Sequence, residues 1–219
     1  MVVTPNLLWS PRRSVRHGFI ASIVLMALTT FQLETPALAS GVWELARPAQ
    51  FGEGIQFDAA GFSSVSCATP GNCTAVGSFM NSDVDRRAFT MTSTDGEWEL
   101  AQPAQFEDDI QNESPHASFT SVSCATPGNC TAVGYFRNSS DGFEAFTMTL
   151  TDGEWENARP AQFEDGIQSD QPSAFFTSVS CTSLGNCTAV GDFRNSDGDR
   201  RAFTMTSTDG EWETAQPAQ

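Results

Sequence analysis

The sequence contains no lysine, a single tyrosine and two histidines, and its formal net charge is −16 at pH 7. So acidic a surface repels phosphate backbones and anionic lipid headgroups, which argues against nucleic acid and lipid as partners. The same charge keeps a protein soluble. The composition therefore indicates a soluble protein whose partner is neither a nucleic acid nor a membrane.

Long apolar runs are missing after residue 33. A basic segment (12–17) precedes an uncharged run (18–33), and small residues follow at Ala37 and Ala39. This order predicts a secretory signal peptide over residues 1–39, cleaved after Ala39. The alternative is a retained N-terminal anchor, although the run is short for a membrane span. We therefore expect the single domain at 40–219 to be secreted and to act outside the cell or at its surface, without membrane insertion after processing.

Apolar residues at helical spacing are also missing after residue 39, and an internal repeat takes their place. Cys67, Cys124 and Cys181 are 57 residues apart, and each is followed 31 residues later by a tryptophan. The repeats are placed at about 41–95, 96–152 and 153–209, with a terminal strand at 210–219.

One repeat predicts four short strands separated by turn residues. Phe146 and Met148 alternate with Thr147 and Thr149, which is the period of a half-buried strand. The fold class expected is all-β. In the second repeat the strands are placed at 118–124, 129–136, 144–151 and 153–163.

Each repeat contains two cysteines separated by five residues, ATPGN or TSLGN, that are typical of a turn. Two strands joined by such a turn bring the flanking thiols within disulfide reach, and export makes oxidation plausible. A zinc site is the alternative, but no second thiol pair or histidine lies at ligand spacing within a repeat. The expected bridges are Cys67–Cys73, Cys124–Cys130 and Cys181–Cys187.

The order SVSC-x5-CTAVG, then Gly-x-Trp, then a proline resembles the tandem repeat of secreted proteins from high-GC Gram-positive bacteria. That resemblance covers residues 41–219 and implies propeller-blade-like units and secretion, without an agreed activity. The segments at 93–98, 150–155 and 207–212 also resemble a shortened Asp-box of sialidase-type propellers.

Three repeats are fewer than the four to eight blades that close a propeller. We expect three four-stranded repeats in a propeller-like arc; the alternative is a closed pseudo-threefold β-trefoil or prism. The segment Gly41–Phe51 matches a fourth strand whose first three strands are missing. Its open edge predicts self-association or docking on another repeat-bearing protein. Trp98 and Trp155, in units with neighbours on both sides, are expected to be buried between sheets.

Catalytic chemistry finds little support. After residue 39 the one histidine is His116, and the one tyrosine, Tyr135, stands where the other repeats have Ser78 and Asp192. A Ser-His-Asp or Cys-His arrangement therefore lacks a repeated base. We expect no enzyme activity and interpret Tyr135 as an ordinary strand residue.

Acidic loops supply the weak metal candidates. The loop NSDGD at 195–199 spaces oxygen ligands as the start of a calcium loop does, although the remaining EF-hand positions do not match. Calcium is the candidate cofactor of this loop, with Asn195, Asp197 and Asp199 as its ligands. The segments 106–111 and 163–168 are expected to form a solvated rim.

Two functions of different classes fit these features. The first is a non-catalytic binding or interaction module that presents repeated sites to a glycan or a protein at the cell exterior. The alternative is an extracellular glycan-acting hydrolase on a sialidase-like scaffold.

Overall fold

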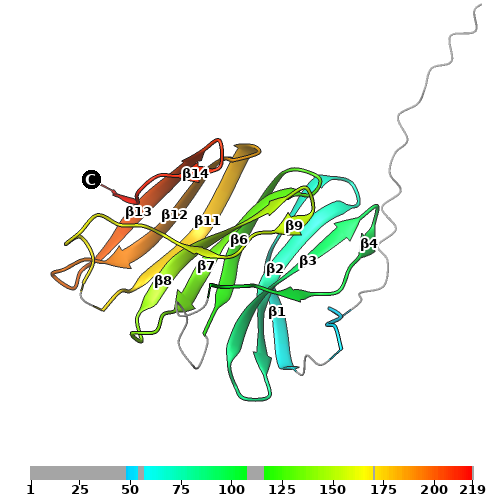
Figure 1. The fold of residues 1–219 in the computed structure, drawn as a ribbon, viewed down its shortest axis with the longest axis horizontal. Helices are drawn as coiled ribbons and strands as arrows, with labels where there is room; N and C mark the ends of the chain where they lie inside the picture. Colours follow the sequence, from blue (N-terminus) through cyan, green and yellow to red (C-terminus); the bar gives the residue numbers. More distant parts are fainter. Residues whose placement is uncertain (1–47, 54–56, 108–115, 170, 219) are drawn as a thin grey trace, which may run out of the picture. The chain divides into compact units, whose positions relative to one another are not determined.

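The computed structural model describes residues 48–53, 57–107, 116–169 and 171–218, and these residues form an all-β protein built of three antiparallel sheets. The predicted signal peptide and the start of the segment Gly41–Phe51 lie outside the described residues. Figure 1 shows the three sheets side by side in chain order. Within the described residues, no helix is long and apolar enough to cross a membrane.

Each sheet repeats one topology, in which three consecutive strands pair as a meander and two very short strands both pair with the third. The first sheet contains β1 (Phe57–Thr69), β2 (Asn72–Asn81), β3 (Arg86–Thr94), β4 (Glu97–Trp98) and β5 (Gln102–Pro103). The second contains β6 (Ser118–Thr126), β7 (Asn129–Arg137), β8 (Phe143–Thr151), β9 (Glu154–Trp155) and β10 (Arg159–Pro160). The third contains β11 (Ala174–Ser183), β12 (Asn186–Arg194), β13 (Arg200–Thr208), β14 (Glu211–Trp212) and β15 (Gln216–Pro217).

The sheets stack face to face, as blades of a propeller do. β6 packs against β1, β2 and β3 of the first sheet, and β11 packs against β6, β7 and β8 of the second. The first strands β1, β6 and β11 therefore lie next to one another, in the position of inner blade strands. This confirms the expected propeller-like arrangement of three repeated units.

The predicted fourth strand is split into two short pieces. In the second sheet Leu150 pairs with Trp155 and Phe146 pairs with Pro160. Between these two pairs the N–H of Glu156 donates to the carbonyl of Thr149, and the chain then leaves the ladder until Arg159. Proline has no N–H to donate, which limits how far pairing can extend at this edge.

The chain after each split strand reaches across to the next sheet. Phe106 packs against Phe136 and Phe146 of the second sheet, with ring centroids 5.1 and 5.0 Å away. Phe163 makes the matching contacts in the third sheet. Phe106 and Phe163 are thus core residues, although the sequence placed them at the start of solvated loops.

Phe51 packs on the first sheet as Phe106 and Phe163 pack on the second and third. Its ring lies 5.0 Å from that of Phe79 and 5.2 Å from that of Phe89, and the N–H of Ala101 donates to the carbonyl of Gln50. The end of the segment Gly41–Phe51 therefore completes the outer side of the first sheet.

Two apolar clusters hold the sheets together. One lies between the first and second sheets and includes Val76, Phe119 and Val122; the other lies between the second and third and includes Val133 and Phe176. A fully buried Phe or Val side chain contributes about 1.5–3 kcal/mol to stability. The junctions between sheets are therefore the core of the protein.

A glycine at the end of each CTAVG segment allows the first two strands of a sheet to approach. A Cβ added at Gly134 would lie 2.1 Å from the carbonyl oxygen of Ser118, where the pairing of β6 with β7 shifts register. Gly77 and Gly191 meet the same obstacle. Any side chain at these positions would force the strands apart.

The three predicted disulfides are present, and in each of them the two cysteines are direct partners across the first hairpin of a sheet. The described residues include no free cysteine. Closing so short a loop contributes roughly 2 kcal/mol in the chain-entropy treatment. Disulfides of this kind persist in oxidising surroundings.

The burial expected for the two central tryptophans is wrong for Trp98, which is 45% exposed. Trp98 pairs with Ser93 at the outer edge of the first sheet, on a face that no other sheet of the described residues covers. Trp155 is half-buried, because its sheet has a neighbour on the matching face and the ring packs against that junction.

Candidate binding site

The repeated parts of the chain have structural roles that account for much of their sequence. The carbonyl of Gly71 accepts hydrogen bonds from the N–H of Gly96 (2.9 Å) and the hydroxyl of Ser93 (2.6 Å), so the Pro-Gly-Asn turn is tied to the Asp-Gly turn. Asp95 and Gly96 both have positive φ, at 51° and 89°. Asp-Gly suits such a hairpin turn.

The acidic loops are organised by their leading asparagines. The Oδ1 atom of Asn195 accepts a hydrogen bond of 2.7 Å from the N–H of Asp199, and the N–H of Gly198 donates to its carbonyl. Asn138 and Asn81 close their loops in the same way. Asparagine favours turns because its side chain can bond the backbone two to four residues ahead.

This geometry gives Asn195 a structural role that the sequence analysis missed. The carboxylate of Asp199 lies 3.1 Å from the guanidinium of Arg201, which is a surface ion pair. Within the described residues no group of three or more His, Cys, Asp or Glu side chains is placed to hold a metal. Calcium binding by Asn195, Asp197 and Asp199 stays a prediction, which a thermal shift on addition of calcium would test.

One place in the molecule breaks the repeat. His116, Tyr135, Phe143 and Phe175 form an aromatic cluster in which every ring is partly exposed. The Tyr135 ring lies 5.0 Å from Phe175 and 5.9 Å from Phe143, and the His116 ring lies 5.6 Å from Phe143. These separations are those of favourable aromatic pairs.

The other repeats place different residues at the matching positions. Tyr135 corresponds to Ser78 and Asp192, and Phe175 corresponds to Ser118, because each is paired with the same point of its own hairpin. The sequence analysis treated Tyr135 and His116 separately, as an ordinary strand residue and a loop residue. Comparing the repeats position by position would have shown that the departures from the pattern coincide.

Two arginines lie beside the cluster. The N–H of Arg137 donates to the carbonyl of His116 at 3.2 Å. Arg86 and His116 are paired through their backbones in an isolated parallel β-bridge. Burial lowers the pKa of His116, and the positive charges of Arg86 and Arg137 lower it further. The imidazole is therefore neutral at pH 7, and the positive charge at this place belongs to the two guanidinium groups.

The carboxylates beside the cluster are held by their own loop. Asp141 lies 3.1 Å from a guanidinium nitrogen of Arg137, and Glu144 accepts a hydrogen bond from the amide of Asn138. The cluster thus brings together aromatic rings and cations, and the carboxylates beside it are engaged by Arg137 and Asn138.

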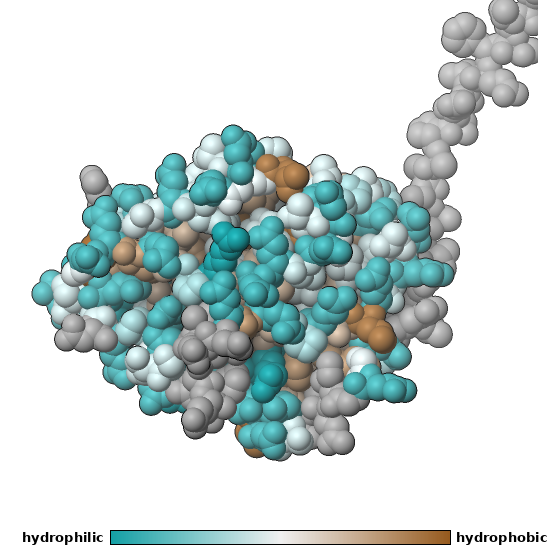
Figure 2. Space-filling view, viewed as in Figure 1, coloured by the Kyte–Doolittle hydropathy of each residue, from teal (hydrophilic) through white to brown (hydrophobic). Residues whose placement is uncertain are grey.

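A shallow hollow, open to solvent, lies where the hairpin turns of the second and third sheets meet, and it is lined by residues including Cys130 and Cys181. Its volume of about 10 Å³ has room for about one water molecule, which is far less than a ligand pocket needs. Hydrophilic residues predominate on the face shown in Figure 2.

No family model matches the sequence, and no curated protein matches it. Among solved structures, the chain is similar to one described as "YCF48 bound to D1 peptide", with a TM-score of 0.37 and 14% sequence identity. The alignment covers 73% of this chain, which spans only 41% of that one. This similarity is too low to bear on function.

Proposed function

We propose that the protein is a secreted, non-catalytic binding module whose partner is a protein or a glycan at the cell exterior. The observation that carries this proposal is the aromatic cluster of His116, Tyr135, Phe143 and Phe175, which breaks an otherwise regular repeat. Export is supported by the predicted signal peptide and by three disulfides, which suit an oxidising compartment.

A protein segment is the favoured partner. Tyrosine, phenylalanine and arginine are enriched in protein interfaces, and tyrosine and arginine are common among the residues that dominate binding energy. Here Tyr135 and two phenylalanines are partly exposed and adjacent to Arg86 and Arg137. An extended peptide that places an aromatic or apolar side chain on the rings and a carboxylate near the guanidinium groups would fit.

Binding can be tested with a peptide-display library, a glycan array and a panel of fluorogenic glycosides, applied in parallel to the purified protein. We expect selected peptides to bind the wild type at least tenfold more tightly than Tyr135→Ser, which carries the residue that the first repeat has there. The matched control is Leu184→Ser, since Leu184 is an exposed apolar side chain in a hairpin turn outside the cluster. Glycoside turnover that Tyr135→Ser abolishes would contradict a non-catalytic role and favour the hydrolase.

A further inference from the structure

Among the residues that the structure describes, the stack of sheets leaves one face uncovered at each end. The head face, on the first sheet, carries Phe62, Val65 and Trp98, which are 51%, 60% and 45% exposed. The tail face, on the third sheet, carries Ser178, Ser180, Thr188 and Val190, all exposed, with Val190 at 39%. These residues are the counterparts of residues that are covered inside the stack.

The same two kinds of face meet at both junctions inside the stack. At each junction, the face of one sheet that corresponds to the head face packs on the face of the preceding sheet that corresponds to the tail face. Phe119 and Val122, which correspond to Phe62 and Val65, are buried in the cluster that contains Val76. Phe176 and Val179 are buried in the same way against Val133. Val76 and Val133 correspond to Val190. The apolar groups that the two ends expose are thus the two halves of a contact that the protein already makes.

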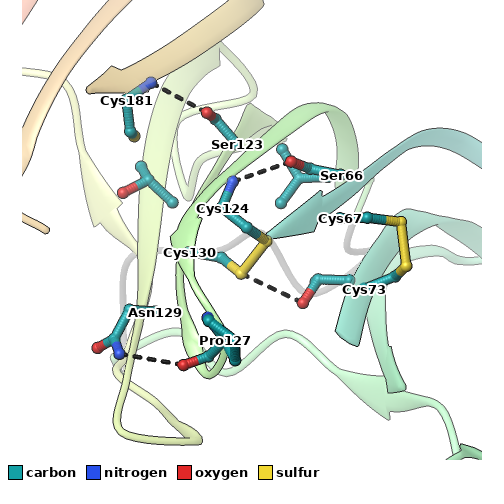
Figure 3. The surroundings of a disulfide bond; sticks show 12 residues. Ser66, Cys67, Cys73, Ser123, Cys124, Pro127, Asn129, Cys130 and Cys181 are labelled. Carbon is teal, nitrogen blue, oxygen red and sulfur yellow. Dashed lines mark hydrogen bonds between the residues drawn. A yellow bond between two sulfur atoms is a disulfide. The ribbon is translucent and has the colours of Figure 1, made fainter. Parts of the chain in front are cut away.

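The polar groups of the inner junctions are also paired. The N–H of Cys124 donates to Ser66 Oγ at 3.0 Å, and the N–H of Cys181 donates to Ser123 Oγ at 2.9 Å, as Figure 3 shows. Two residues earlier in each strand, the N–H groups of Val122 and Val179 donate to the hydroxyls of Ser64 and Ser121, at 3.3 and 3.2 Å. Hydroxyls of one first strand therefore bond the amides of the next.

The two ends carry the unmatched members of this series. Ser178 and Ser180 are exposed on the tail face in the positions of Ser64 and Ser66. β1 is an edge strand of the first sheet, and the amides of Val65 and Cys67 lie on its open side in the positions of Val122 and Cys124. The tail supplies acceptors where the head supplies donors.

A third hydroxyl repeats the pattern. Ser63 Oγ lies 2.7 Å from the carbonyl of Phe119, and Thr120 Oγ1 lies 2.8 Å from that of Phe176. In the third sheet Thr177 Oγ1 is exposed and bonds only the carbonyl of Val190 in its own sheet, among the described residues. A head face brought onto the tail face would present the carbonyl of Phe62 to this hydroxyl.

A charged pair on the tail face has room on the head face. Arg200 and Asp192 form a two-point ion pair on the tail, with both nitrogen–oxygen distances at 2.6 Å. The head residue in the position of Ser118 and Phe175 is Gly61, and a Cβ placed there would have nothing within 4 Å. The smallest residue of the series therefore stands where the ion pair needs space.

We propose that the head face of one copy binds the tail face of a second copy, with the residues and hydrogen bonds of the inner junctions. A head-to-tail contact generates a ring if its rotation closes. Two copies joined at both ends contain six sheets, which lies within the four to eight blades of closed propellers. This inference does not rest on the proposed binding role, because the aromatic cluster lies within one copy.

The electrostatics make the association dependent on salt. Each copy has a formal charge of −16, so two copies repel one another, and dissolved salt screens that repulsion. The junction itself is apolar and hydrogen-bonded, and salt screens such contacts little. We therefore expect tighter association at 0.5 M than at 0.05 M salt.

The test is sedimentation of the exported protein at micromolar concentration, with its disulfides formed. We expect the wild type to have twice the mass of one copy. Val65→Arg, on the head face, and Val190→Arg, on the tail face, should each sediment as single copies. The matched control is Val84→Arg, at a 70% exposed loop valine, which should keep the wild-type mass.

Mixing separates a head-to-tail contact from other dimers. Val65→Arg retains an intact tail and Val190→Arg retains an intact head, so an equimolar mixture should form a complex of two copies through one junction. A wild type that stays a single copy, a wild type larger than two copies, or a mixture that fails to associate would each overturn the proposal. Both substituted valines are exposed, so thermal unfolding of each variant should remain cooperative.

Discussion

The inner junctions and the outer faces of this protein contain nearly the same residues in different surroundings. Phe119 and Phe62 occupy the same position in successive repeats, yet the first is fully buried and the second is half exposed. Val133 and Val190 differ in the same way. The difference teaches that the place of a repeat in the stack, rather than its residues, decides what those residues contribute.

The largest expected difference in stability is between variants at the two matching phenylalanines, Phe119 and Phe62. Replacing Phe119 by Ala leaves a cavity between two sheets. We therefore expect the free energy of unfolding to fall by about 3–5 kcal/mol. Phe62→Ala, made in the single-copy Val190→Arg background, should cost less than about 1 kcal/mol, since little buried surface is lost. Urea denaturation measures both. Equal costs would mean that the sheets do not stack as described.

The disulfides should differ in the ease of their reduction. Removing any one bridge by paired Cys→Ser changes should cost roughly 2 kcal/mol, because each closes a loop of the same length. Cys67 is exposed, whereas Cys130 is buried under Thr74, whose Oγ1 lies 3.3 Å from its sulfur. In the single-copy Val190→Arg variant under mild reductant, peptide mapping should therefore find Cys67–Cys73 opened first. Simultaneous opening of all three bridges would contradict this.

Replacing the loop asparagines should change stability by less than the substitutions above. The side chain of Asn138 is buried and accepts hydrogen bonds from the N–H groups of Ser140 and Gly142, at 3.0 and 2.8 Å. Asn138→Ala leaves these donors without their acceptor, and we expect a loss of about 1–2 kcal/mol. Asn195→Ala, in a more exposed loop, should lose less than half of that. Thermal unfolding compares them, and the reverse order would refute the reasoning from burial.

The smallest expected effect concerns pH. Because the folded chain lowers the pKa of His116 below 6.5, the unfolded chain takes up a proton first as the pH falls. Stability should thus decline slightly as the pH drops from 6.5 towards the lowered value, and should not depend on this group above 6.5. His116→Ser, which copies Ser173 of the third repeat, should remove that part of the slope. Denaturation midpoints between pH 5 and 8 would reveal an unchanged slope if the assignment is wrong.

Much of the local structure was predictable from the sequence. The first three strands of the second repeat start and end within two residues of their expected positions, because alternating side chains and turn residues are local signals. The disulfides followed from spacing alone. These features depend on one repeat at a time.

The rest depends on neighbours that the sequence does not identify. Trp98 and Trp155 have the same local context, and only the presence of a sheet beside Trp155 explains why it is the more buried. Phe106 follows a strand and precedes an acidic run, so its role as a core residue of the next sheet has no local sign. The aromatic cluster combines residues from three strands and a loop that lie far apart in the sequence.

Hydrogen exchange at backbone amides tests the central claim most directly, since it compares identical positions within one sample. In the single-copy Val190→Arg variant, the amides of Val122, Cys124, Val179 and Cys181 should exchange slowly, and those of Val65 and Cys67 should exchange fast. In the wild type, the amides of Val65 and Cys67 should become as protected as their counterparts, because a second copy supplies Ser178 and Ser180. Fast exchange at Val65 and Cys67 in both proteins, or slow exchange in both, would contradict the account.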